Sequence, residues 1–235
     1  MKQIEIASVH DVAVGLGREK VITSLDVTRF GKDPKDIFDT GYTIQQLQLC
    51  MEANEKGLAD WFMIYHQGKS PKEILKERFE NLEFGFGEND RFMKSQWFSH
   101  SGENYWVEGK EEPGYYLLNF VGEEDEYREL RFENITFSEQ EKRIAMLSGK
   151  VRAPFSLVLE SVFSIFDTHE TMLLKKWNHL SNTRTSNGSL LYLGSTDCAV
   201  NGKKMINIFE FPKKHEKEEE YFFGTGAVLM MKKVI

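Results

Sequence analysis

The stretch Val200-Asn201-Gly202-Lys203 separates two runs of strand-forming residues, Leu190 to Leu193 and Met205 to Phe211. Asn-Gly between such runs is a strong hairpin signal, because a type I′ turn needs a positive φ at both of its central residues. A third run, Tyr221 to Met231, follows after the charged loop 212–220. Three consecutive runs with polar links predict an antiparallel β-meander in the C-terminal part of the chain.

Helix signals lie upstream of this meander. Ser70-Pro71-Lys72-Glu73 combines a serine cap, a proline at the first helical position and a glutamate three residues after the cap. Thr43-Ile44-Gln45-Gln46 has the capping-box form and predicts a second helix. The run from Phe155 to Phe166 is apolar on nearly all sides, which is typical of a buried central helix near 155–166. Helices and strands occur in blocks, so we predict an α+β fold in which the meander packs against several helices.

Other segments give less specific signals. Lys2 to Val14 and Lys20 to Val27 mix β-branched and polar residues and predict two N-terminal strands. Ser138-Glu139-Gln140-Glu141 has the form of a further helix start. Leu58 to Tyr65 is a short apolar run that fits either a buried strand or a helix, and Trp177 to Arg184 fits a fourth strand beside the meander.

The composition of the 235 residues is that of an ordinary globular protein, with 40% hydrophobic and 29% charged residues. No repeat or low-complexity linker divides the chain, so we expect a single α+β domain over 1–235 with a soft internal boundary near 121–137. No apolar run is long enough to span a membrane and no secretory signal opens the sequence, which predicts a soluble, cytoplasmic protein without a membrane partner. Cys50 and Cys198 are therefore expected to be free thiols.

The formal net charge of −7 makes the chain acidic and argues against duplex nucleic acid as a partner, since such proteins carry a basic surface. The sequence contains no P-loop and no C-x-x-C or H-E-x-x-H motif, so no cofactor is predicted. Asp167, His169 and Glu170 form the densest cluster of metal-ligating residue types. On a helix His169 would point away from the two carboxylates, so a helix end explains the cluster better than a metal site.

The most suggestive segment is Trp177 to Ser186, which packs an indole, an imidazole, hydroxyls and an arginine into ten residues. On a strand, Trp177, His179 and Thr183 share one face, and Arg184 at the end could reach a phosphate or carboxylate. This pattern predicts a ligand-binding platform on the sheet. The alternative is an ordinary edge strand whose tryptophan and histidine find hydrogen-bond partners within the protein.

Two functional hypotheses remain open. The first is a non-catalytic binding or accessory protein that recognises a protein or a small molecule through the sheet face at 177–184, or through the acidic segment 121–133. The second is a hydrolase of unfamiliar type, in which His100, His179 and Arg184 converge with a carboxylate on one pocket. The absence of a nucleophile elbow and of every tested catalytic motif favours the binding protein.

Overall fold

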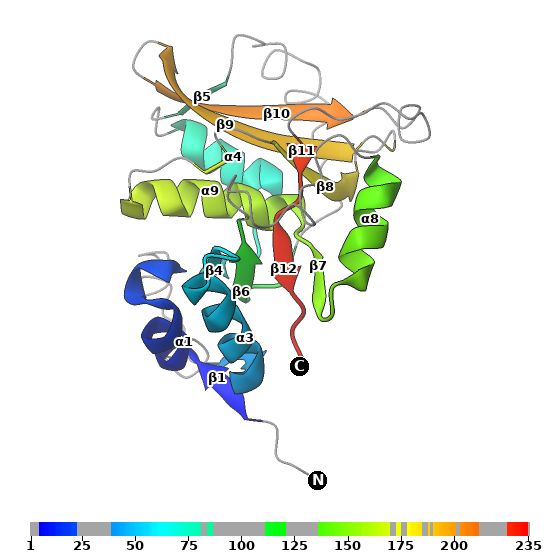
Figure 1. The fold of residues 1–235 in the computed structure, drawn as a ribbon. Coiled ribbons are helices and arrows are strands. Elements are labelled where there is room, and N and C mark those ends of the chain that lie inside the picture. Colours follow the sequence, from blue (N-terminus) through cyan, green and yellow to red (C-terminus); the bar gives the residue numbers. More distant parts are fainter. Residues whose placement is uncertain are drawn as a thin grey trace.

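A computed structural model gives the α+β fold of the chain (Figure 1). It describes residues 5–22, 39–80, 84–86, 111–120, 136–169, 173–174, 178–184, 188, 190–200, 203–211 and 225–234. The helices are α1 (Val9–Leu16), α3 (Ile44–Glu55), α4 (Pro71–Glu80), α8 (Phe137–Met146) and α9 (Phe155–His169), with a 3-10 turn at Arg18–Lys20. The strands are β1 (Ile6–Ser8), β2 (Val21–Ile22), β3 (Asp39–Thr43), β4 (Trp61–His66), β5 (Phe84–Phe86), β6 (Gly114–Asn119), β7 (Lys150–Arg152), β8 (Asn178–Arg184), β9 (Leu190–Val200), β10 (Lys203–Phe211), β11 (Thr225–Gly226) and β12 (Leu229–Met231).

Two five-stranded sheets lie on either side of the long helix α9 (Figure 1). The upper sheet has the strand order β11-β8-β9-β10-β5, and the lower sheet has the order β2-β4-β6-β12-β7. Helices α1 and α3 cover the face of the lower sheet that points away from α9, where they share a core cluster with β4 and β6. The short pair β1–β3 runs antiparallel beside these two helices.

The meander in the upper sheet confirms the hairpin prediction. Strands β9 and β10 pair antiparallel with Val200 opposite Lys203, and β8 pairs antiparallel with β9 on the other side. The turn residues 201–202 lie outside the described ranges. The predicted third strand does not lie beside β10: β11 pairs with β8, and β12 crosses to the lower sheet between β6 and β7. The link between β11 and β12 is fixed at Val228, whose carbonyl accepts the N–H of Ala153 at 2.8 Å.

Helix α9 is the buried central helix that its sequence predicts. Ten of its residues are buried, and its apolar side chains belong to the core cluster that contains residues of both sheets. Such a helix has apolar neighbours on nearly every side, which explains why its sequence lacks a polar stripe. Within the described residues no helix is both long and apolar enough to cross a membrane.

Local capping explains where several helices begin. Ser70 and Glu73 form the predicted capping box, and α4 begins at Pro71. The predicted strand over Lys2 to Val14 is wrong beyond Ser8, because Ser8 and Asp11 form a capping box that starts α1. The predicted start at Ser138 is also displaced, since Thr136 accepts the N–H of Glu139 and α8 begins at Phe137.

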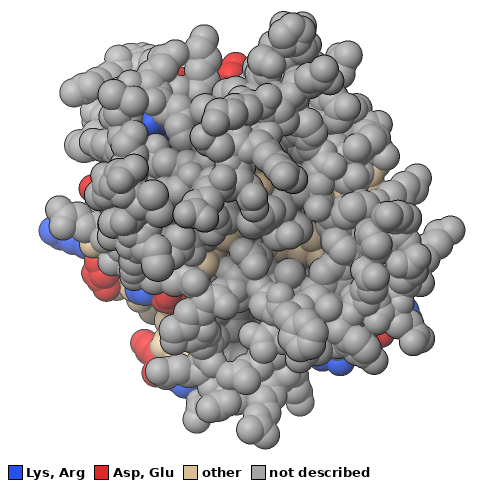
Figure 2. Space-filling view, turned by 90° about the horizontal axis from the view of Figure 1, so that it is seen from above, with Lys and Arg blue, Asp and Glu red and all other residues tan. Residues whose placement is uncertain are grey.

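Most of the apolar run Leu58 to Tyr65, which fitted two structures, belongs to strand β4, which begins at Trp61. It is buried on both faces of the lower sheet, so it lacks the alternation of a half-exposed strand. Charges of both signs are interspersed among the described residues visible from above the upper sheet, and they form no patch of a single sign in that view (Figure 2).

Candidate ligand-binding groove

A groove of about 960 Å³ lies between α3 and the turn that joins α8 to β7. The C-terminal segment after β12 contributes to it, and Figure 1 shows this segment between the two elements. Its volume falls within the range of small-molecule sites in proteins. The lining residues are Glu5, Thr43, Ile44, Gln45, Gln46, Gln48, Leu49, Cys50, Ala53, Trp61, Met146, Leu147, Ser148, Gly149, Lys150, Met231 and Val234.

Helix α3 forms one wall of the groove, and its capping residues fix its position. Thr43 accepts the N–H of Gln46 at 3.1 Å, and the Gln46 carbonyl oxygen accepts the N–H of Thr43 at 3.0 Å. The Gln46 amide also donates to the carbonyl of Lys232 at 2.8 Å. The same side chain therefore starts the helix and holds the C-terminal segment against it.

The opposite wall is a tight turn. Gly149 has a φ of 70°, which a residue with a side chain adopts only at a cost, and the N–H of Lys150 bonds to the carbonyl of Leu147 at 3.2 Å. The N–H of Lys232 then donates to the carbonyl of Gly149 at 2.8 Å. This turn leaves Met146, the last residue of α8, exposed at the edge of the groove.

Trp61, Cys50 and Met231 are the buried side chains among the described lining residues, and they form the floor of the groove. The side chain of Asn54 holds Trp61 below α3, because it accepts the Trp61 N–H at 2.8 Å and donates to the Trp61 carbonyl at 3.2 Å. Burial raises the pKa of the Cys50 thiol to about 12. The thiol is therefore protonated near neutral pH and contributes apolar surface, not a nucleophile.

Apolar side chains gather along this groove. The large apolar residues exposed in the described part are Val14, Leu49, Met146 and Val234, and the last three line the groove. Their exposed fractions are 57% for Leu49, 77% for Met146 and 48% for Val234. Single exposed apolar residues are common on protein surfaces, but several around one concavity are typical of a binding site.

Known proteins offer no guide to this groove. Neither protein-family models, nor curated proteins, nor solved structures match the chain. Functional inference therefore depends on the geometry and chemistry of its own residues.

The two members of the predicted platform whose side chains the structure describes, His179 and Thr183, point into the protein core. His179 is fully buried, its Nε2–H donates to the carbonyl of Ala153 at 3.1 Å, and its Nδ1 accepts the N–H of Val228 at 3.0 Å. Thr183 is buried as well, and its hydroxyl accepts the N–H of Phe155 at the start of α9 at 3.2 Å. These contacts agree with the alternative in which the histidine finds partners within the protein.

Trp177 lies outside the described residues, as does the side chain of Arg184, whose backbone belongs to β8. Ligand binding by the whole face 177–184 therefore stays a prediction. Burial lowers the pKa of His179 to about 3, and the nearby positive charge of Arg152 adds to the effect. His179 is neutral at neutral pH and joins three backbone segments.

The metal-ligand candidates have other partners. Asp167 forms an ion pair with Arg78 at 2.5 Å, and the ring of His169 donates to the carbonyl of Glu19 at 2.9 Å. Glu170 lies outside the described ranges. Among the described residues, no group of three or more histidine, cysteine, aspartate and glutamate side chains is placed to hold a metal ion.

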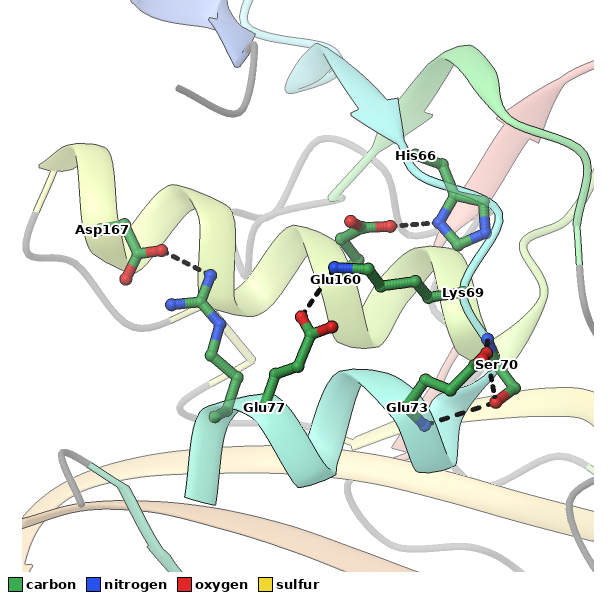
Figure 3. Close-up of polar contacts among 8 residues, drawn as sticks. His66, Lys69, Ser70, Glu73, Glu77, Glu160 and Asp167 are labelled. Carbon is green, nitrogen blue, oxygen red and sulfur yellow. Dashed lines mark hydrogen bonds and ion pairs between the residues drawn. The ribbon is translucent and has the colours of Figure 1, made fainter. Parts of the chain in front are cut away.

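The predicted convergence of His100, His179 and Arg184 on a hydrolase pocket stays a prediction, because His100 and the side chain of Arg184 lie outside the described residues. The segment 121–133 lies outside them as well, and both ring nitrogens of His179 bond to backbone groups. A histidine–carboxylate pair does exist, but between residues that the sequence analysis missed. Figure 3 shows Glu160 reaching from α9 to Nδ1 of His66 at the end of β4.

His66 and Glu160 are both buried, and Nε2 of His66 has no hydrogen-bond partner among the described residues. A carboxylate on Nδ1 orients the imidazole in the same way as in catalytic dyads. His66 does not line the groove, however, and its ring is not exposed. The sequence signal was a lone carboxylate inside the apolar run Phe155 to Phe166.

Proposed function

We propose that the chain is a non-catalytic cytoplasmic binding protein that takes an apolar small ligand into the groove between α3 and the α8–β7 turn. The observation that supports this proposal is that three exposed apolar side chains line one groove of ligand size: Leu49, Met146 and Val234.

The groove supports binding better than catalysis. Its floor consists of an indole, a protonated thiol and a thioether. Among the described residues the lining has no histidine and no group suited to general base catalysis near neutral pH other than the exposed Glu5. The walls are held by hydrogen bonds of the Gly149 backbone and of the Gln46 side chain, so the concavity is preformed. A preformed apolar site loses little conformational entropy when it binds.

Decanol is the probe for this proposal, because it offers an apolar chain without a charge. We expect it to bind and to change the fluorescence of Trp61, measured as the difference between the wild type and the Trp61→Phe variant. Met146→Glu should weaken binding by about tenfold, because a carboxylate at the edge of the groove opposes contact with an apolar chain.

Val14→Glu is the matched control, since Val14 is as exposed as Met146 but does not line the groove. It should leave decanol affinity within about twofold of the wild type, which is a small energy difference. Equal losses in the two variants, or no saturable decanol binding by the wild type, would rule out the groove as a specific apolar site.

A further inference from the structure

The groove also carries a charge pattern that specifies the class of its ligand. We propose that it binds an amphipathic anion, an apolar chain or ring with one carboxylate or similar head group, and that Lys150 receives the head group. This inference rests on the proposed function, since it assumes that the groove is a binding site. Beyond the proposed function, the inference specifies that the ligand is an anion and that its head group lies at Lys150.

Three observations place the ammonium group of Lys150 in the groove. Lys150 is itself a lining residue. Its Nζ lies 5.7 Å from the centre of the Trp61 ring, which is part of the floor. Its positive charge also acts to lower the pKa of Cys50, against the larger effect of burial. The ammonium group therefore lies near Trp61 and Cys50, two of the buried side chains over which a ligand would rest.

The ammonium group of Lys150 forms no ion pair with any carboxylate in the part of the chain that the structure describes. The neighbouring cation on β7 behaves differently. Arg152 is buried and donates to Glu141 at 2.6 Å, to Gln140 at 2.9 Å and to the carbonyl of Leu180 at 2.5 Å. Of these two cations Lys150 is the one placed to receive a ligand's charge.

Glu5, beside the first residue of α3, adds a negative charge to the lining of the groove. Its carbonyl accepts the N–H of Ile44, the first residue of the helix, whereas Lys150 acts on Cys50 six residues later. Six residues of α-helix span about 9 Å. The ammonium group of Lys150 attracts an anionic head group and the carboxylate of Glu5 repels one, so we place the head group at Lys150 and the apolar part against apolar lining residues such as Leu49.

The test compares three amphiphiles of equal chain length below their micelle concentrations: decanoate, decanol and decyltrimethylammonium. We expect decanoate to bind about tenfold more tightly than decanol, the ratio that one partly screened ion pair supplies. Decyltrimethylammonium should bind no more tightly than decanol. Raising the salt concentration should reduce the affinity for decanoate and leave that for decanol unchanged.

Lys150→Gln should bring the affinity for decanoate to within about twofold of that for decanol, a difference of a few tenths of a kcal/mol. Lys150→Arg should restore most of the preference, because it returns the charge. Lys56→Gln is the matched control, as this exposed lysine pairs with Glu52 and does not line the groove. It should keep the wild-type preference.

The outcomes separate this inference from the proposed function. Equal binding of decanoate and decanol by the wild type would overturn the anion assignment and leave an apolar binding groove. A preference for decanoate that persists in Lys150→Gln would overturn the role of Lys150. Failure of all three amphiphiles to bind would remove the groove itself, and the anion assignment with it.

Discussion

Glu160→Leu is expected to lower the free energy of unfolding by about 3 kcal/mol, the lower end of the range for breaking a buried pair of titratable groups. Glu160 lies within the apolar helix α9, and its carboxylate bonds to Nδ1 of His66. Loss of the carboxylate leaves Nδ1 of His66 buried without an acceptor. Nε2 already has no partner among the described residues, so the variant ring would have none at either nitrogen.

Denaturant titration measures this effect against a matched control. Glu52→Leu changes an exposed glutamate of α3 that pairs with exposed Lys56, and it should change the free energy of unfolding by less than about 0.5 kcal/mol. The double variant His66→Leu, Glu160→Leu should be more stable than Glu160→Leu alone, because it removes the stranded imidazole. Equal stability of Glu160→Leu and Glu52→Leu would show that the pair contributes nothing to the fold.

Local sequence signals correctly predicted a hairpin and two helix starts, because residues close together in sequence determine these features. The Asn201-Gly202 pair identified the β9–β10 hairpin, and the boxes at Thr43 and Ser70 identified the starts of α3 and α4. These signals succeed because the hydrogen bonds involved join residues only three positions apart. The box at Ser8 was missed because its partner is an aspartate and the segment contains many β-branched residues.

The division of the last predicted strand between the two sheets depends on long-range contacts, and the sequence did not predict it. The run Tyr221 to Met231 has strand composition throughout, but it divides between two sheets at Val228, which bonds to Ala153 and His179. Both partners lie 49 or more residues away, so no local pattern specifies the division. The crossing places the C-terminal segment against α3 and thereby completes the groove.

The groove itself was not predicted, for a related reason. Leu49 and Met146 are single apolar residues on otherwise polar helix faces, and such residues usually need no explanation. Only their convergence with Val234 and Lys150 makes them a candidate site, and that convergence joins three distant segments of the chain. Residues close together in sequence give a stronger local signal, which is why the binding platform was predicted on β8.

Protonation of His179 is expected to make the fold less stable in mild acid. Its pKa is lowered to about 3 in the folded state by burial and by Arg152, whereas an exposed histidine in the unfolded chain titrates near about 6.5. Between these two pH values the unfolded state binds the additional proton, so the stability contribution is complete above about pH 6.5 and is lost as the pH falls. At pH 5 the loss from this one group is about 2 kcal/mol.

His179→Gln separates this effect from the titration of carboxylates, which are common to both proteins. The variant is expected to be less stable at pH 7, because it disturbs the bonds to Ala153 and Val228, but its stability should fall less steeply between pH 6.5 and 5. In the wild type, the ring proton resonances of His179 followed by NMR should not shift between pH 8 and 5. A His179 resonance that titrates near pH 6.5 in the folded protein, or equal slopes in the two proteins, would mean that this imidazole is not held neutral by the core.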